Sequence, residues 1–242
     1  MDFIKKVLQD LPPIHSGETE VLSSYVASKR SVFSKKLQEK LENQEDFCWA
    51  LGESVLRFID NNVNEGAHTL EIGSGVSTFV FAKNKAKHIC ITPSSSEIER
   101  IKNYANNQNL DLEKIEFIND YSEFALPKLK PNDLFDLILI DGKHAFPWPF
   151  IDWFYSVIHL KKGGILIVDD THLTTGRILS DFMKKDPTWE YLETLDQKTC
   201  IFKKLTDDIR NIAWHMQPFI TSDYKENYFK KVKGYLKRIL NN

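Results

Sequence analysis

The chain has 242 residues, of which 42% are hydrophobic and 27% charged, and this is enough for one sizeable α/β domain with an extension. A formal net charge of −2 gives no general electrostatic reason to expect a nucleic-acid partner. The three cysteines are widely spaced, and we find neither a secretory signal nor an apolar stretch near the roughly 20 residues of a spanning helix, so we expect a cytoplasmic protein.

The first 46 residues are expected to form a helical extension. They are polar, and Pro12-Pro13 interrupts them. Apolar residues at helical spacing then predict an amphipathic helix over residues 47–62. The main domain is expected to begin with this helix and to run from 47 to 205.

The most informative stretch, residues 69–78, reads Thr-Leu-Glu-Ile-Gly-Ser-Gly-Val-Ser-Thr. An apolar run predicts a buried strand over residues 68–72, and Phe79–Ala82 can start a helix. Glycines between a strand and a helix are typical of a nucleotide site, because they let the backbone approach a ligand beside free N–H groups. Thr78 stands where the dinucleotide pattern has its third glycine, which favours an adenosine-containing ligand other than NAD.

Strands and helices are predicted to alternate through the rest of the domain. We expect strands at 87–92, 115–118, 134–140 and 165–168, and helices at 96–108, 147–160 and 174–185. Ser94 and Glu97 form a plausible capping box for the helix at 96–108. Two β-like runs at 189–194 and 199–204, joined through Asp196-Gln197, predict a closing hairpin. Apolar strands separated by helices indicate a parallel sheet covered on both faces.

Residues 206–242 are expected to form a separate helical appendage. Apolar residues at helical spacing alternate there with lysines and arginines, among them Phe229, Val232, Leu236 and Ile239 on the apolar side. A basic amphipathic helix can bind an anionic membrane. The favoured interpretation is instead a helix packed on its own domain or on a second subunit of a homodimer.

Acidic residues follow four of the predicted strands. Ligands of open α/β sheets bind outside the carboxyl ends of the strands, so these acids are expected to converge on one crevice. Asp141, Asp169 and Asp170 would repel one another unless a cation or protons neutralise them, and oxygen ligands suit Mg²⁺ or Ca²⁺. The alternative is that these acids cap helices or accept hydrogen bonds from loop N–H groups.

His144 lies three residues after Asp141 and is a candidate general base. An imidazole titrates near neutrality and can take a proton from a hydroxyl nucleophile. The alternative is an ordinary surface or hydrogen-bonded histidine, and His172 and Lys143 are the other candidates for the base. The aromatic stretch 146–153 could line a substrate pocket, although core packing is favoured for most of its side chains.

The order of these features resembles the class I S-adenosylmethionine-dependent methyltransferases over roughly residues 47–204. Residues 69–78 resemble the first motif of that superfamily, and residues 119–122 resemble the segment after the third strand whose acid contacts the adenine amine. Residues 140–144, followed by 160–170, resemble a subset of metal-dependent small-molecule O-methyltransferases of the catechol and macrolide-sugar types. The resemblance implies an α/β fold with a Rossmann-like, doubly wound, mostly parallel seven-stranded sheet whose last strand is antiparallel.

The resemblance also implies S-adenosylmethionine as the cofactor and a role for each matched residue. His144 would be the catalytic base beside Asp141, and Asp141, Asp169 and Asp170 would hold Mg²⁺ or Ca²⁺. The implied cofactor-binding residues are Glu71, Gly73, Ser74, Gly75, Ser77, Thr78, Thr92, Asp120, Tyr121 and Asp141. This chain departs from the superfamily at the end of the second strand, where an acid usually binds the ribose hydroxyls and Thr92 stands here.

The sequence therefore predicts methyl transfer to an oxygen of a small-molecule acceptor, a sugar or a phenol, with divalent-metal assistance. The alternative that stays open is a binding or regulatory module with a degenerate cofactor pocket, for which Thr92 is the main argument. Weaker alternatives are an oligomeric scaffold or membrane-surface protein that uses the basic tail, and a nicotinamide oxidoreductase. No nucleic-acid partner is expected.

Overall fold

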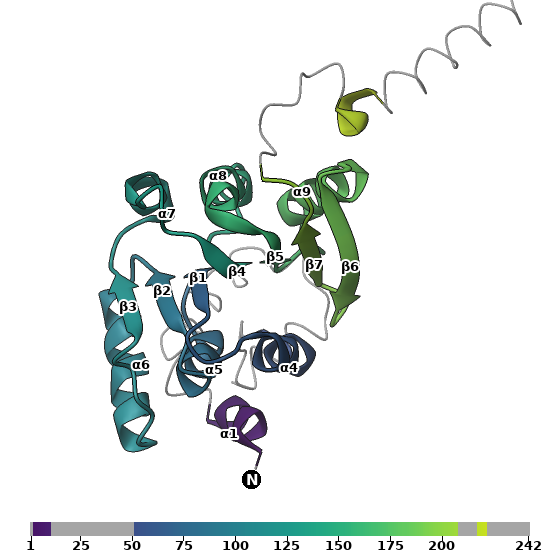
Figure 1. The fold of residues 1–242 in the computed structure, drawn as a ribbon. Coiled ribbons are helices and arrows are strands. Elements are labelled where there is room, and N and C mark those ends of the chain that lie inside the picture. The colour runs from purple at the N-terminus through teal and green to yellow at the C-terminus, as the bar shows by residue number, and fades with distance from the viewer. Residues whose placement is uncertain (1, 11–50, 208–216, 222–242) are drawn as a thin grey trace, which may run out of the picture.

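The computed structural model describes residues 2–10, 51–207 and 217–221 (Figure 1). The described part of the chain is built around a seven-stranded sheet. Its strands are β1 (His68–Ile72), β2 (Lys87–Ile91), β3 (Ile115–Ile118), β4 (Phe135–Ile140), β5 (Leu160–Val168), β6 (Trp189–Leu195) and β7 (Thr199–Lys204).

The sheet has the order β3-β2-β1-β4-β5-β7-β6. Strands β1 to β5 pair in parallel, whereas β7 is antiparallel to both β5 and β6. This confirms the predicted Rossmann-like sheet with an antiparallel last strand. The chain leaves β1 toward one edge of the sheet and continues from β4 toward the other, so the crevice of an open α/β sheet is expected at the carboxyl ends of β1 and β4.

Helices cover both faces of the sheet (Figure 1). On one face lie α1 (Phe3–Gln9), α4 (Glu53–Asn62), α5 (Val76–Lys83) and α6 (Ser95–Asn107). On the other lie α7 (Ser122–Ala125), α8 (Trp148–Ser156) and α9 (Thr174–Lys185), with 3-10 turns η1 (Leu126–Lys128) and η2 (Val157–His159). Strand β4 shows why its sequence is continuously apolar: Leu137 and Leu139 enter one core, and Ile138 and Ile140 enter the other.

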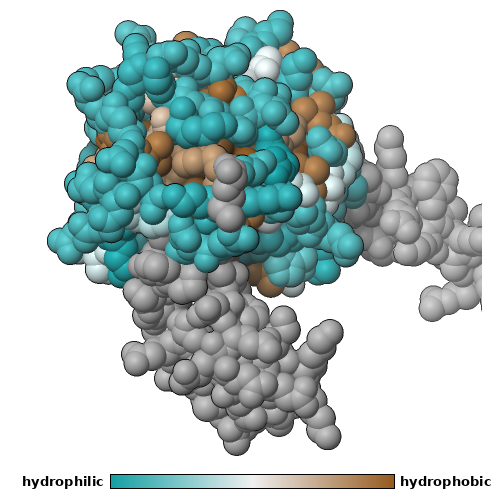
Figure 2. Space-filling model, turned by 90° about the horizontal axis from the view of Figure 1, so that it is seen from below, coloured by the Kyte–Doolittle hydropathy of each residue, from teal (hydrophilic) through white to brown (hydrophobic). Residues whose placement is uncertain are grey.

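Figure 2 shows how polar and apolar residues are distributed on one face of the molecule. Seen from below the view of Figure 1, it is mostly hydrophilic, and hydrophobic residues gather in a band across its middle (Figure 2). No helix within the described ranges is long and apolar enough to cross a membrane.

One strand differs clearly from its predicted bounds. We expected β5 to begin at residue 165, but it begins at Leu160 and includes the sequence Lys161-Lys162-Gly163-Gly164. The ammonium of Lys204, which is buried, donates hydrogen bonds to the carbonyls of Val157 (2.9 Å) and Leu160 (2.6 Å). These bonds hold the first residue of η2 and the first residue of β5 against β7.

The predicted terminal regions fall largely outside the described residues. Of the extension predicted over 1–46, the structure describes α1, whose Ile4 and Val7 are buried against α4 and α5. The Tyr104 hydroxyl donates a 2.8 Å hydrogen bond to Asp10, and Arg57 lies 3.0 Å from Asp2. Most of the appendage predicted over 206–242, including its basic amphipathic segment, lies outside the described residues. The division into three regions, 1–46, 47–205 and 206–242, stays a prediction.

Candidate active site

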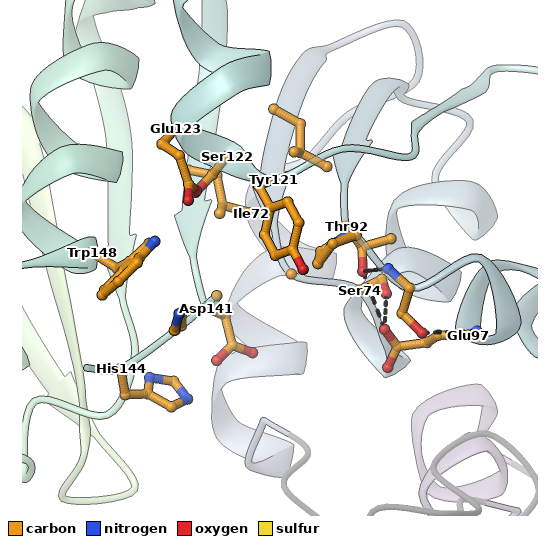
Figure 3. Close-up of a pocket in the computed structure, with 16 residues that line it drawn as sticks. Ile72, Ser74, Thr92, Glu97, Tyr121, Ser122, Glu123, Asp141, His144 and Trp148 are labelled. Carbon is orange, nitrogen blue, oxygen red and sulfur yellow. Dashed lines mark hydrogen bonds between the residues drawn. The ribbon is translucent and has the colours of Figure 1, made fainter. Parts of the chain in front are cut away.

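A pocket of about 530 Å³ lies at the carboxyl ends of β1, β2 and β4 (Figure 3). This volume lies within the usual range for small-molecule and cofactor sites. The pocket is lined by the end of β1 and the glycine turn, the loop after β2, the start of α7, the loop after β4, and Trp148 of α8. Figure 3 places His144 and Asp141 toward one end of it and Ser74, Thr92 and Glu97 at the other.

The glycine turn brings the ends of β1 and β4 into contact. Gly73 has φ +99°, and a Cβ atom added there would lie 2.2 Å from the carbonyl oxygen of Asp141. The N–H of Asp141 in turn donates a 2.9 Å hydrogen bond to the carbonyl of Ile72. Only glycine permits both this backbone conformation and this approach, so the turn fixes where Asp141 stands.

Three residues predicted to bind the cofactor hold the turn from inside the protein. The Glu71 carboxylate is buried and accepts a 2.7 Å hydrogen bond from Ser77, as well as one from Thr78. The Nε2 atom of buried His88 lies 3.3 Å from Glu71, and the N–H of Gly75 donates to Thr78 Oγ1 (3.2 Å). The side chains of Glu71, Ser77 and Thr78 are therefore engaged with one another, outside the pocket lining.

A carboxylate that sequence reasoning missed lies beside the end of β2. Glu97 lines the pocket, and its Oε2 accepts hydrogen bonds from the hydroxyls of Ser74 (2.6 Å) and Thr92 (3.3 Å) (Figure 3). The predicted N-cap is confirmed, since Ser94 Oγ accepts from the N–H of Glu97 (3.2 Å). The Ser94 N–H donates to Thr92 Oγ1 (3.4 Å), so the Glu97 carboxylate faces Ser74 and Thr92 in place of closing the capping box.

The segment after β3 is arranged differently from the prediction. Asp120 accepts hydrogen bonds from Lys128 (3.1 Å) and the N–H of Tyr121 (2.9 Å), which lower the pKa of its carboxyl group, and it is not part of the pocket lining. Tyr121 and Glu123 do line the pocket, as does Trp148. Glu123 Oε2 and Trp148 Nε1 are buried and have no hydrogen-bond partner among the described residues.

The catalytic candidate His144 pairs with a strand-end acid. Its Nε2 atom lies 3.0 Å from Oδ2 of Asp170, a residue with φ +52°. Burial alone would raise the pKa of Asp170, but the hydrogen bond and charge of His144, aided by Lys198 and His172, lower it to about 2. Burial, together with the charges of Asp169 and Asp170, raises the pKa of Asp141 well above its usual value.

The predicted metal ligands are not gathered as a set of three carboxylates. Ligand atoms of Asp141, His144 and Asp170 lie within 4.8 Å of one another, and Asp169 is not part of this group. The buried Asp169 instead accepts hydrogen bonds from Thr199 and from the ammonium of Lys198 (3.0 Å). Lys198 also lies 3.4 Å from Asp170, and although burial acts to lower its pKa, these acids raise it.

The two other candidates for the base have different surroundings. His172 Nδ1 lies 3.5 Å from Asp170, on the oxygen that also faces Lys198. The Lys143 ammonium lies 3.6 Å from the ring centroid of Trp148, a cation–π contact. Neither competes with His144 for its position at Oδ2 of Asp170.

Comparison with known proteins agrees with this architecture. Residues 70–171 match a family described as a methyltransferase domain. The described residues have the Rossmann-like fold found in class I methyltransferases. No curated protein sequence matches it significantly.

Solved structures share the fold of this chain at low sequence identity. A protein from Corynebacterium glutamicum is 14% identical with a TM-score of 0.56, covering 79% of this chain and 99% of that one. A candidate caffeoyl-CoA O-methyltransferase from Staphylococcus aureus is 18% identical with a TM-score of 0.52, covering 84% and 100%. A candidate rRNA methylase from Clostridium thermocellum is 14% identical with a TM-score of 0.52, covering 64% and 96%. At these identities the likeness shows the fold alone.

The pocket at the carboxyl ends of β1, β2 and β4 thus contains some of the residues that the sequence predicted for the site. Its lining includes the predicted residues Gly73, Ser74, Thr92, Tyr121, Asp141 and His144. Outside the lining lie Glu71, Gly75, Ser77, Thr78, Asp120, Asp169 and Asp170. The sequence analysis missed Glu123 and assigned Glu97 only to a helix cap. It also missed Lys198, which lies in the β6–β7 hairpin and contacts the acids after β5 because β7 pairs with β5.

Proposed function

We propose that this chain is an S-adenosylmethionine-dependent methyltransferase that methylates a hydroxyl of a small-molecule acceptor, a sugar or a phenol. The observation that carries the proposal is the single pocket that joins the glycine turn of β1 to His144. Gly73 fixes the backbone at the cofactor end, and the His144–Asp170 pair supplies a proton acceptor at the other.

Two polar atoms of the pocket, on the same side as His144 in Figure 3, suit an adenosine-containing ligand. Glu123 Oε2 is a buried acceptor and Trp148 Nε1 a buried donor, both without a partner among the described residues. An adenine edge offers an amino donor and ring-nitrogen acceptors, so it would supply what both atoms lack. Tyr121 and the backbone of Gly73 and Ser74 would contact the rest of the cofactor. When bound, the cofactor supplies a methyl group on a positively charged sulfur.

His144 is proposed to remove the proton of the acceptor hydroxyl. If Nε2–H donates to Asp170, as the 3.0 Å separation supports, Nδ1 is left as the proton acceptor. The ionised Asp170 would hold the ring in this orientation and stabilise the imidazolium that forms, as in other acid–histidine pairs. Asp141, which lines the same end of the pocket, would orient the hydroxyl.

The predicted three-carboxylate metal site does not fit the arrangement of these acids. The Lys198 ammonium lies 3.0 Å from Asp169 and 3.4 Å from Asp170, where it would repel a divalent cation. Of the remaining group of Asp141, His144 and Asp170, the Asp170 carboxylate is already paired with His144 on one oxygen and with Lys198 on the other. We propose that Lys198 provides the compensating charge that the sequence led us to assign to a metal.

Titration calorimetry with S-adenosylmethionine, followed by an acceptor screen, tests the proposal. We expect micromolar binding, unchanged by a chelator, and methylation of a hydroxylated small molecule. His144→Ala should lower turnover about 100-fold or more while changing cofactor affinity little, because the base acts on the acceptor. His172→Ala is the matched control, since it removes another histidine that faces Asp170.

The outcomes separate this proposal from its rivals. Absence of cofactor binding would favour the non-catalytic module with a degenerate pocket. Equal loss of turnover and affinity in His144→Ala would contradict the base assignment. Because the fold is shared with a candidate rRNA methylase, the screen should include RNA, and methylation of RNA alone would contradict the small-molecule acceptor.

A further inference from the structure

The end of β2 contributes a hydroxyl to the pocket where an acid was expected. Thr92 is 3% exposed, and its Oγ1 is hydrogen-bonded to Glu97 at 3.3 Å. The N–H of Ser94 also donates to this oxygen, at 3.4 Å. Thr92 is therefore surrounded by protein partners, and the group that carries charge at this end of the pocket is the Glu97 carboxylate.

Glu97 is held in place from three directions. Ser74 of the glycine turn donates to it at 2.6 Å, Thr92 donates from the end of β2, and Ser94 Oγ caps its backbone N–H at 3.2 Å. The residue is 9% exposed and still lines the pocket (Figure 3). Fixed donors of this kind define the position of a carboxylate before a ligand arrives, which reduces the ordering cost of binding.

The chemistry of a fixed carboxylate selects its ligand. An ionised carboxylate has about four acceptor sites and no donor, and its hydrogen bonds with hydroxyl donors are among the stronger ones. Two neighbouring hydroxyls on one ring match its two oxygens, and a ribose presents such a pair. A phosphate or another anion at this position would be repelled by the Glu97 charge.

We propose that Glu97 accepts hydrogen bonds from the 2′- and 3′-hydroxyls of the cofactor ribose, with Ser74 and Thr92 as positioning residues. This inference rests on the proposed function, because it concerns the same pocket and the same cofactor. In the superfamily that the sequence resembles, one acid at the end of the second strand usually binds the ribose hydroxyls. Here the residue after β2 supplies only a hydroxyl, and the first turn of α6 supplies the carboxylate.

The test compares S-adenosylhomocysteine with its 2′-deoxy and 3′-deoxy analogues by titration calorimetry. For the unaltered chain, each missing hydroxyl should weaken binding about 10-fold. Glu97→Gln should weaken binding of S-adenosylhomocysteine roughly 10- to 100-fold and lose most of the discrimination against the deoxy analogues. The control is Glu99→Gln, an exposed acid two residues further along α6, which should change neither quantity.

A second variant protects the test against misfolding. Glu97→Asp keeps the charge and withdraws the carboxylate by one methylene, so it should fold and still lose discrimination between the ribose analogues. Unchanged affinity and discrimination in both Glu97 variants would overturn this inference and leave the proposed function standing. If the unaltered chain does not bind S-adenosylhomocysteine at all, the proposed function fails, and the inference fails with it.

Discussion

At the scale of single residues, Asp170 connects the groups of the proposed catalytic end. One of its oxygens faces His144 at 3.0 Å, and the other faces Lys198 at 3.4 Å and His172 at 3.5 Å. Its backbone has φ +52°, which is uncommon for a residue other than glycine and occurs more often at functional sites. Because a carboxylate with a pKa of about 2 stays ionised near neutrality, Asp170 can hold a protonated partner throughout a proton transfer.

Lys198 gives a residue-scale prediction about metal binding. Lys198→Met removes the ammonium beside Asp169 and Asp170, so the variant should bind Mn²⁺ or Mg²⁺ more tightly than the unaltered chain. It should also lose about 2 kcal/mol of unfolding free energy, because within the described residues buried Asp169 would keep only Thr199 as a side-chain hydrogen-bond partner. Calorimetric Mn²⁺ titration and urea unfolding measure the two effects.

Lys203→Met is the matched control for this experiment, since Lys203 lies on β7 and is only partly buried. It should change neither metal affinity nor activity. Micromolar Mn²⁺ binding by the unaltered chain, removed by Asp170→Asn, would contradict the role assigned to Lys198 and restore a metal to the site.

At the scale of elements, the junction of β1 and β4 depends on Gly73. Two effects oppose a side chain there: the positive φ, and the approach of an added Cβ to within 2.2 Å of Asp141 O. Gly73→Ala should therefore lower the unfolding free energy by roughly 2–5 kcal/mol and weaken cofactor binding, since Asp141 and the turn must move apart. Urea unfolding and calorimetry measure the losses.

A second glycine separates the two effects. Gly163 in β5 also has positive φ, at +81°, but an added Cβ meets nothing within 4 Å. Gly163→Ala should cost only the conformational strain, about 1–2 kcal/mol, and leave cofactor binding unchanged. Equal losses in the two variants would show that the contact with Asp141 contributes nothing.

The elements also show what the sequence could and could not predict. Apolar strands, the glycine turn and the Asp196-Gln197 hairpin are local patterns, and the structure confirms them. Asp169 and Asp170 are adjacent in sequence and both contact Lys198, but Asp169 also binds Thr199 of β7, whereas Asp170 pairs with His144. Their separation could not be predicted without knowing that β7 lies beside β5.

Glu97 illustrates a different limit. Its spacing from Ser94 matched a capping box, and that local pattern accounted for the residue completely. Its tertiary partner Ser74 lies 23 positions earlier, on the far side of α5 and β2 in the chain. The carboxylate could have closed the capping box, but hydrogen bonds from the hydroxyls of Ser74 and Thr92 determine where it points.

At the scale of the whole molecule, the pH dependence of stability should contain a contribution from Asp152 in α8. This residue is fully buried, and neither carboxylate oxygen has a hydrogen-bond partner among the described residues. Burial, with a smaller contribution from the charge of Glu123, raises the pKa of Asp152 to about 7 despite the opposing effects of Ser122 and His144. Folding therefore favours the protonated form.

The sign of this contribution follows from the direction of the shift. Between the unfolded pKa of about 4 and the folded value of about 7, the folded state holds a proton that the unfolded state has lost, so stability falls as pH rises. A shift of this size corresponds to about 4 kcal/mol, fully present below pH 4 and lost through pH 7. Asp141 has a raised pKa as well and acts in the same direction.

Asp152→Asn isolates the contribution of Asp152, because Asp141 is common to both proteins. The variant keeps the shape of the side chain and cannot ionise. As the pH rises from 4 to 8, the unaltered chain should therefore lose a few kcal/mol of unfolding free energy that the variant keeps. Urea unfolding at one-unit steps of pH measures the difference. A difference independent of pH would contradict the raised pKa of Asp152 in the folded protein. The experiment thus tests whether burial in α8 keeps Asp152 protonated although the proposed catalytic histidine, His144, is close enough to influence its pKa.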